Sequence, residues 1–448
     1  MLQTLKNAWN TKDIRSKIIF TLFIILLYRV GTVIPVPFVE ANDFAQQFSG
    51  TILDYLNTLS GGSLGTATLF ALGVSPYINA SIIIQLLAVV FPKLAEIGKN
   101  DKKKMNFITR ITTVVLAIVT AIGYYFLLKN GNMLSNAATE GKATWLYAIA
   151  IIVCYVAGAT LIMWLAERIN EKGIGNGISL ILFANIISSV PSFAIQLGSI
   201  VVDTYKYENK AWLYAIVSTL FAILLLAVIF AFTVFVIWIT GSERRIPVQY
   251  AKQIVSGKQY GGARQYIPLK VNAANVMPII FAQAIMFIPL TFINYASLES
   301  APEWVRLLLD MNSWLYNLVF AILIIAFTLF YTAITVNPTQ MAEDIKRNNG
   351  FIPGVKPGKP TADYLDVIMS RITWPGALFL AVVAILPSFA SMFGVKAEFA
   401  QFFGGTSLLI LVGVVLDTLQ QVESHLLMRH YDGLLSTGRI KGRSGAAY

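Results

Sequence analysis

Residues 55–92 carry no charged side chain over 38 positions, a length that fits neither one membrane crossing nor two. A transmembrane helix uses about 20 apolar residues, so one crossing takes up about half of this run. The charged residues between positions 31 and 54 are all acidic, whereas residues 93–104 hold five lysines. Because lysine-rich flanks stay on the cytoplasmic side, the two ends of the run face opposite sides of a membrane. The other half of the run therefore lies at or near membrane depth without spanning.

The half that does not span covers residues 60–70 and is interrupted by Gly61, Gly62 and Gly65. The dipeptide Ser75-Pro76 separates it from the spanning run at 77–90. Non-helical backbone is tolerated at this depth only where protein buries it or where it lines a water-filled cavity. We therefore expect a re-entrant half-helix folded into the mouth of a pore. A small apolar outer loop is the alternative.

The composition is that of an all-α polytopic membrane protein, with 56% hydrophobic and 13% charged residues. The single cysteine, Cys154, lies in an apolar run, and both histidines lie in the C-terminal tail. We therefore expect no disulfide, no metal site and no cofactor. Residues 1–17 place Leu2, Leu5 and Trp9 on one helical face opposite basic residues, which predicts an amphipathic helix on the membrane surface.

Apolar runs and their flanks predict ten membrane crossings. They lie at about 18–36, 75–92, 107–128, 144–166, 176–197, 212–240, 272–294, 314–336, 372–393 and 404–424. If the N-terminus is cytoplasmic and the sides alternate, the cytoplasmic segments hold 27 of the 34 Lys and Arg residues. This bias predicts that both termini lie in the cytoplasm.

The outer loop at 198–211 divides the ten predicted crossings into two halves of five. An odd number of crossings per half means that two structurally related halves must be inverted relative to each other, with a functional path at their interface. The predicted organisation is an N-terminal half at 18–197, a hinge loop at 198–211, a C-terminal half at 212–424 and a cytoplasmic tail at 425–448.

The predicted spans contain almost no charge. Arg29 is the only charged residue well inside a span, and we expect its side chain to snorkel toward the outer surface. Ion-coupled transporters use intramembrane acidic, histidine or lysine side chains to bind or relay the coupling ion, and this chain has no such set. A path through it would be lined by aliphatic, hydroxyl and amide groups, which suits a hydrophobic constriction that closes by dewetting.

Two long cytoplasmic insertions, at 241–271 and 337–371, hold 11 of the 34 basic residues. Alternating apolar residues and turn glycines predict a hairpin over 243–270, and the second insertion predicts a helix to about residue 348. Positive loops beside a membrane can be topology signals alone, but loops of this length favour docking to ribosomal RNA phosphates or an acidic protein surface. The candidate docking side chains are Arg244, Arg245, Lys252, Arg264, Lys346, Arg347, Lys356 and Lys359.

Two short motifs imitate enzyme sites and are rejected. Residues 354–360 resemble a phosphate-binding loop, but the spacing is one residue short and a proline replaces the Ser/Thr that binds Mg²⁺. Residues 173–177 resemble a dinucleotide fingerprint, yet a membrane span follows and no strand precedes them. The spans hold no Ser/His/Asp or Cys/His set, so we do not expect an enzyme.

Five spaced motifs resemble the SecY family, the channel subunits of the bacterial Sec translocon, over nearly the whole chain. The motifs lie at 70–87, 173–179, 268–272, 351–354 and 404–410. The resemblance implies two inverted halves that open around an hourglass pore, with a short plug helix that blocks the outer funnel. The implied plug residues are Gly61, Gly62, Ser63, Leu64, Gly65, Thr66, Ala67, Thr68, Leu69 and Phe70.

The resemblance also implies a pore ring, a lateral gate and a set of partners. The ring residues would be Val74, Ile78, Ile178, Leu182, Ile280 and Ile410. The lateral gate, where signal sequences exit into membrane lipid, would be lined by Asn79, Gln85, Asn275 and Gln283. Implied partners are the membrane subunits SecE and SecG, the SecA motor ATPase, the ribosome, and secretory polypeptides with their signal sequences. The implied location is the bacterial plasma membrane.

One position departs from the family pattern, because Lys356 stands where the family has an arginine in the turn of the second cytoplasmic loop. Lysine keeps the charge but lacks the planar fork that binds bidentately.

Two other functions remain open at this point. A secondary transporter for a small neutral solute would also have inverted repeats, but this chain lacks the intramembrane charged side chains that would bind a coupling ion. A structural membrane scaffold would not need the uncharged re-entrant segment or the basic loops.

Overall fold

The computed structural model describes residues 6, 8–40, 57, 60–131, 133–135, 144–191, 211–250, 253–255, 258–260, 264–274, 276–292, 302–310, 313–392 and 405–436. Three parts of the sequence predictions lie outside these residues. They are the expected hinge loop at 198–211 (Ala211 excepted), the candidate residues Lys252 and Asn275, and the tail beyond Ser436. The chain forms two compact units. Unit 1 comprises residues 1–47, 56–188 and 414–448, and unit 2 comprises residues 48–55 and 189–413.

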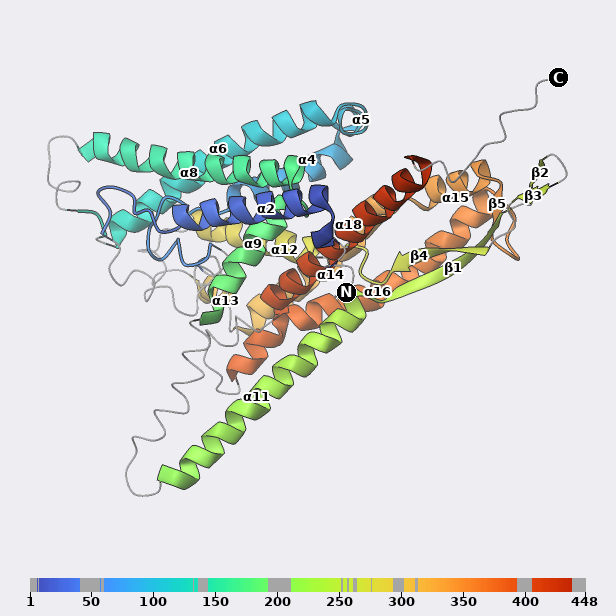
Figure 1. Ribbon diagram of the computed structural model, residues 1–448. Coiled ribbons are helices and arrows are strands. Elements are labelled where there is room, and N and C mark those ends of the chain that lie inside the picture. Colours follow the sequence, from blue (N-terminus) through green and yellow to red (C-terminus); the bar gives the residue numbers. More distant parts are fainter. Residues whose placement is uncertain are drawn as a thin grey trace. The chain divides into compact units, whose positions relative to one another are not determined.

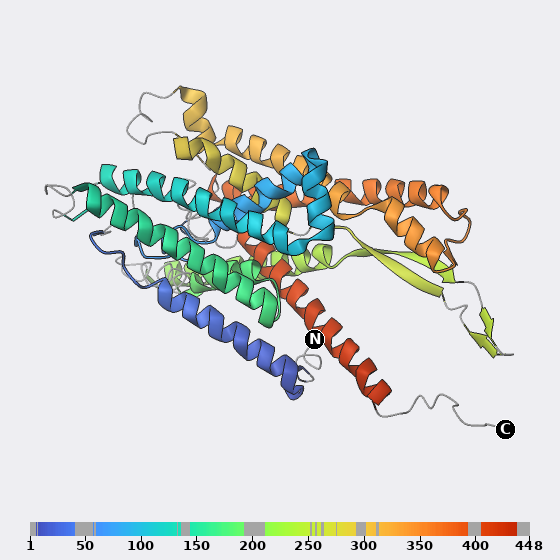
Figure 2. The same cartoon turned by 90° about the horizontal axis from the view of Figure 1, so that it is seen from above.

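Unit 1 is built of helices (Figures 1 and 2). They are α2 (Lys12–Gly31), α4 (Ser75–Val90), α5 (Pro92–Asn100), α6 (Lys102–Asn130), α8 (Thr144–Lys172), α9 (Gly177–Ser188) and the second part of α18 (Gly405–Ser436). In this unit α4 packs on α6, α6 on α8, and α8 on both α2 and α9. α2 begins at Lys12, after a break at Thr11, so residues 12–17, which the sequence assigns to a surface helix, are continuous with the first predicted apolar run.

Local sequence explains where two of these helices turn and begin. The axis bends by 119° between α4 and α5. Pro92 follows the bend, and a proline disfavours helical conformation in the residue before it, here Phe91. The Asp101 carboxylate accepts a hydrogen bond of 3.2 Å from the backbone N–H of Lys104 and so caps α6. This bond lowers the pKa of the Asp101 carboxyl.

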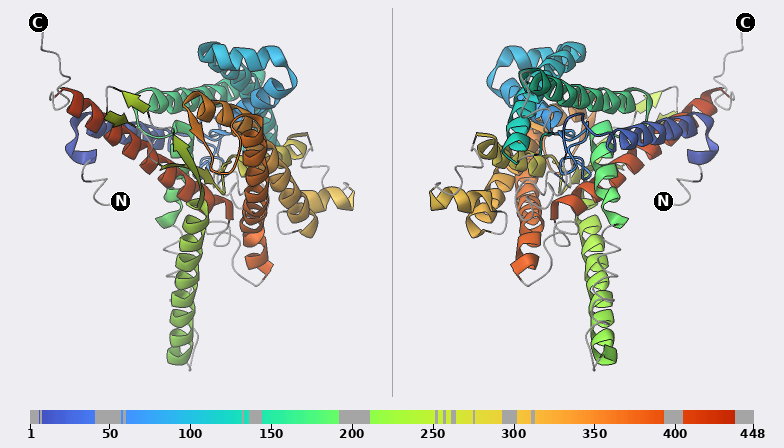
Figure 3. Two further views of the ribbon diagram at one scale, coloured as in Figure 1. Left: turned by 90° about the vertical axis from the view of Figure 1, so that its right-hand side faces the viewer. Right: turned by 90° about the vertical axis from the view of Figure 1, so that its left-hand side faces the viewer.

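Unit 2 combines helices with a small sheet. It contains α11 (Ala211–Thr240), which is one unbroken helix (Figure 3), β1 (Glu243–Tyr250), β2 (Gln253–Val255), β3 (Lys258–Tyr260) and β4 (Arg264–Lys270). It continues with α12 (Met277–Phe292), α13 (Glu303–Leu309), α14 (Trp314–Thr335), α15 (Pro338–Arg347), β5 (Gly350–Phe351), α16 (Lys359–Met392) and the first part of α18 (Gly405–Ser436). α14 packs between α12 and α16.

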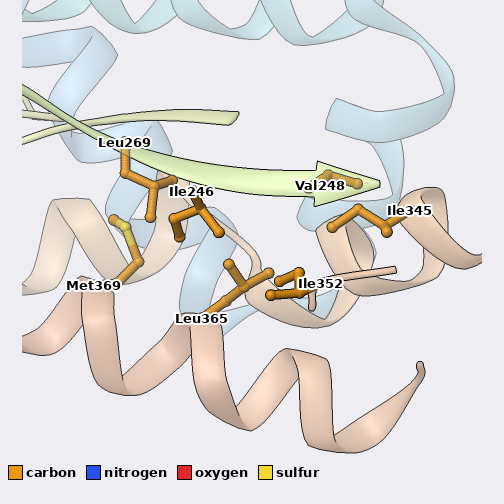
Figure 4. Close-up of a cluster of buried hydrophobic side chains, with 7 residues drawn as sticks. All are labelled: Ile246, Val248, Leu269, Ile345, Ile352, Leu365 and Met369. Atoms are coloured by element: carbon orange, nitrogen blue, oxygen red, sulfur yellow. The ribbon is translucent and has the colours of Figure 1, made fainter. Parts of the chain in front are cut away.

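The two long insertions, at 241–271 and 337–371, form one module rather than two separate protrusions. β1 pairs antiparallel with β4, which confirms the predicted hairpin, and β5 from the second insertion pairs with the other edge of β1. α15 confirms the predicted helix before residue 348. A shared apolar core joins the sheet to α15 and α16 (Figure 4), made of Ile246, Val248, Leu269, Ile345, Ile352, Leu365 and Met369.

The helices agree with a polytopic membrane protein. Among the described residues, a helix overlaps each of the ten predicted apolar runs. Five helices are long and apolar enough to cross a membrane, and six if the bent pair α4–α5 counts as one span. Side chains on α2, α6 and α11 such as Leu26, Val115 and Phe230 are exposed, as expected for surfaces that face lipid.

Candidate functional site

Residues 60–74, which precede α4, form a compact series of turns. The sequence predicts a half-helix over 60–70, and this prediction is wrong for the described residues. Gly61, Gly62 and Gly73 have φ of 69°, 86° and 56°, and Ala67 has φ of 48°. A right-handed helix requires negative φ, so four left-handed residues in 13 positions make a continuous helix impossible here.

The turns are organised around the Asn57 backbone and side chain. The carbonyl oxygen of Asn57 accepts from the Gly62 N–H at 2.8 Å and from the Ser60 hydroxyl at 2.9 Å. Its side-chain oxygen accepts from the Gly65 N–H at 2.8 Å. The segment closes on itself, because a Cβ at Gly73 would lie 3.5 Å from the Ser60 Cβ. The segment therefore has a defined fold of its own directly before Val74.

Helices α6 and α8 hold the middle of the segment through two tyrosines. The Tyr124 hydroxyl donates to the Leu64 carbonyl at 2.5 Å, and the Tyr155 hydroxyl donates to the Ala67 carbonyl at 3.3 Å. The two rings meet edge to face, with centroids 5.0 Å apart. α8 approaches so closely that a Cβ at Gly158 would lie 2.0 Å from the Leu69 carbonyl oxygen. The Tyr155 hydroxyl thus gives the Ala67 carbonyl a partner, whereas the Leu64 carbonyl also accepts from the Ala67 N–H at 3.2 Å.

Helix α2 holds both ends of the segment. The Tyr28 ring stacks on Phe70 with centroids 5.4 Å apart and an interplanar angle of 7°. A Cβ at Gly31 would lie 2.0 Å from Phe70 Cε2, so only glycine leaves room for that ring. After α2 the chain continues the contact, since the Leu69 N–H donates to the Ile34 carbonyl at 2.9 Å.

The Arg29 side chain lies against α9 and the turn segment. Its Nη2 donates to the carbonyl oxygen of Ala184 near the C-terminal end of α9. Nη1 lies 2.8 Å from the position that a Cβ at Gly61 would occupy. Next to Ala184, the Asn185 amide donates to the Tyr28 hydroxyl at 2.9 Å. Carbonyls at the C-terminal end of a helix carry partial negative charge, which explains why the guanidinium lies beside Ala184.

The implied ring residues are divided between the two units. In unit 1, Val74 and Leu182 are buried, and Ile78 and Ile178 are half-buried. In unit 2, Ile410 is buried and Ile280 is half-buried. Spacings of four place Val74 with Ile78 on one face of α4, and Ile178 with Leu182 on one face of α9. Each unit therefore presents apolar side chains at the implied ring positions.

The loop between α8 and α9 fixes where α9 begins. The Gly175 N–H donates to the Gln421 side chain of α18 at 2.9 Å, and the Ile174 N–H donates to the Thr21 hydroxyl of α2 at 3.0 Å. The Gly177 N–H donates to the Asn170 side chain at 2.7 Å. Gly175 has φ of 91°, a conformation that favours glycine. The motif at 173–179 is thus a junction and not a nucleotide site.

Of the implied gate residues, Asn79 and Gln283 are half-buried. Gln85 is exposed and donates to the Ser81 hydroxyl at 3.2 Å. Among the docking candidates, Arg244, Arg245, Lys346, Arg347, Lys356 and Lys359 are exposed on the module, and Arg264 belongs to β4. Arg245 pairs with Glu243 at 2.8 Å.

Sequence reasoning missed the side chains that hold the segment, namely Tyr28, Tyr124, Tyr155 and Asn185. The sequence did contain one indication of these residues, namely tyrosines within apolar runs. A tyrosine hydroxyl buried among apolar residues usually finds a hydrogen-bond partner. The partner of each hydroxyl depends on the tertiary fold, and the sequence alone does not provide it.

The fold is that of the protein-conducting channels. A solved structure of a protein conducting channel matches 92% of this chain and 92% of its own, with a TM-score of 0.59 and 18% identity. A second, concerned with the plug domain of SecY, gives a TM-score of 0.61 at the same coverage and identity. Canine Sec61 in a ribosome–channel complex gives 0.56, with 17% identity and 92% of both chains covered.

Sequence comparison gives the family. The SecY family model matches residues 68–419. The protein translocase subunits SecY of Streptomyces galbus and Bacillus subtilis are 39% and 40% identical, over 97% of this chain and 100% of theirs. The chain belongs to the SecY family. It is therefore a translocation channel subunit and not an enzyme, and the solute-transporter alternative is not favoured.

Proposed function

We propose that this chain lines the pore through which unfolded secretory polypeptides cross the bacterial plasma membrane. The observation that carries the proposal is the turn segment 60–74, which ends at Val74 and is held by α2, α6 and α8. Non-helical backbone at membrane depth needs protein to bury it or a water-filled cavity to line. A folded, buried segment beside a ring position suits a removable plug.

The ring would be the seal below the plug. A pore that passes any sequence must not bind one segment tightly, because that segment would then stall. Branched apolar side chains contact any chain by dispersion and keep a narrow neck dry against ions. The proposal is that the six ring residues line the neck of the pore, and the apolar side chains at all six positions support it.

A lateral gate would open between α4 and α12, so that signal sequences and transmembrane segments pass into lipid. Asn79, Gln85, Asn275 and Gln283 are its proposed polar lining. Polar side chains at a surface that alternately meets protein, water and lipid would keep the gate from closing permanently by hydrophobic contact. The gate thus separates secreted chains from membrane-inserted ones.

The proposed topology has ten crossings in two inverted halves, with both termini in the cytoplasm and SecE and SecG as membrane partners. The bias of basic residues supports this orientation. The cytoplasmic module would dock SecA or the ribosome. Related folds support the second partner: Sec61 was solved in a ribosome–channel complex, and yeast Ssh1 bound to the 80S ribosome gives a TM-score of 0.55.

Crosslinking of an arrested secretory chain tests the proposed pore. A photoreactive group at position 74, 78 or 280 should capture the chain. The same group at position 119 should capture lipid, because Val119 is exposed on α6. If the chain crosslinks equally at position 119, or not at all at the three ring positions, this path for the polypeptide is wrong.

A further inference from the structure

Two consecutive residues of α2 connect the same turn of α9 to opposite ends of the turn segment. Tyr28 accepts from Asn185 and stacks on Phe70, whereas Arg29 donates to Ala184 and lies against Gly61. We infer that Tyr28, Arg29 and Asn185 form a latch that holds the plug segment closed and couples its release to movement of the ring helix α9. This inference rests on the proposed channel function.

The charge of Arg29 makes the latch specific to one arrangement. A guanidinium inside a membrane helix is costly, so it needs acceptors wherever it lies. Among the described residues, no carboxylate lies within ion-pair distance of Arg29. Its acceptor is instead the carbonyl of Ala184, near the negative end of the α9 dipole. If the end of α9 moves, Arg29 loses that acceptor.

The same helix connects the latch to the ring. α9 carries Ile178 and Leu182 near its start and Ala184 and Asn185 near its end. α9 is one continuous helix of twelve residues, so a polypeptide that pushes this helix aside at the ring also moves the latch partners. Ring widening and plug release are therefore one event rather than two.

Gly61 is the position at which the latch meets the plug. A Cβ there would lie 2.8 Å from Arg29 Nη1 and 2.9 Å from Asn185 Oδ1. The neighbouring Gly62 also has positive φ, 86° against 69°, but a Cβ there would have nothing within 4 Å. Replacing each by alanine imposes the same kind of backbone strain, whereas only Gly61→Ala pushes on the latch.

The test measures ion conductance of the idle full-length channel with its partner subunits in planar bilayers. Gly61→Ala should raise conductance about tenfold above Gly62→Ala, because it breaks a hydrogen bond to a charged group. Arg29→Ala should leak similarly, and Arg29→Lys should leak less, since lysine keeps the charge. Equal conductance of the two glycine variants would overturn the latch.

A variant that is expected to lower the idle conductance tests whether general misfolding causes the leak. Asn185→Asp places a carboxylate beside Arg29 that can accept from the Tyr28 hydroxyl, so it should tighten the latch. We expect lower idle conductance than wild type and slower export of a secretory reporter. A leak from Asn185→Asp equal to that of Arg29→Ala would also overturn the inference.

Deletion of residues 61–70 distinguishes failure of the proposed plug function from failure of the latch. If the deletion itself leaves the channel silent, the proposed plug function fails and the latch fails with it. If the deletion leaks but Gly61→Ala matches Gly62→Ala, the plug function stands and only the latch is wrong.

Discussion

Individual hydroxyl groups keep the turn segment in place, and their contribution is small enough to be reversible. Tyr124 and Tyr155 each donate one hydrogen bond to a backbone carbonyl of the segment, at 2.5 Å and 3.3 Å. Such bonds contribute about 0.5–1.5 kcal/mol each. If the segment is the proposed plug, it must leave when a polypeptide arrives, and several weak bonds would allow this.

Tyr124→Phe should loosen the segment without removing a ring from the core. Loss of one hydrogen bond of about 0.5–1.5 kcal/mol raises the open fraction of the plug about two- to tenfold. The measurement is idle ion conductance, with Tyr125→Phe as the control because it removes a hydroxyl from the next residue of the same helix. Equal leak from both variants would show that the Tyr124 bond does not hold the plug.

At the scale of elements, the two basic insertions share one core and one sheet. Leu365 on α16 is fully buried in the same cluster as Ile246 of β1 and Ile345 of α15 (Figure 4). β1 is also the central strand, with β4 on one side and β5 on the other. A partner that docks on one insertion therefore moves the other with it, which two independent loops would not do.

Leu365→Ala should destabilise both insertions together, by about 2–5 kcal/mol, because it leaves a cavity in the shared core. Hydrogen exchange of the β1 amides, which belong to the other insertion, should speed up. Val367→Ala is the matched control, since Val367 is exposed on the same helix. Unchanged protection of β1 in Leu365→Ala would mean that the insertions are independent.

Reversing the charge of Arg244, Arg245, Lys356 and Lys359 to glutamate should abolish motor-driven translocation while membrane insertion continues. Each exposed contact is worth about 0–1 kcal/mol, so several changes are needed together. The control keeps all four charges by exchanging Arg for Lys and Lys for Arg. Normal translocation by the quadruple glutamate variant at low salt would place docking elsewhere.

At the scale of the whole molecule, sequence predicted the pattern of apolar segments better than the conformation between them. Each apolar run has its helix, because hydrophobic length and lysine flanks act locally. The sequence showed that the uncharged residues 60–70 exceed what one membrane crossing needs, but it did not show that they form turns. Their left-handed residues, such as Ala67, depend on partners far along the chain, here the Tyr155 hydroxyl 88 positions away. The acceptor of the Arg29 guanidinium was not predicted for the same reason, since it lies on α9.

The proposed ring must let polypeptides pass without binding them. Exchange of single ring residues for Leu, Met or Val should leave export nearly unchanged, because any branched or flexible apolar side chain preserves dispersion contacts and a dry neck. Serine or glycine at several ring positions should raise ion leak well before export falls.

The most direct measurement pairs ion flux with export of one secretory reporter in the same vesicles across this substitution series. The channel account predicts rising flux with preserved export in the serine variants, and neither change in the conservative ones. Export that collapses on Ile→Val exchange at position 78, 178, 280 or 410, with no leak in the serine variants, would contradict it.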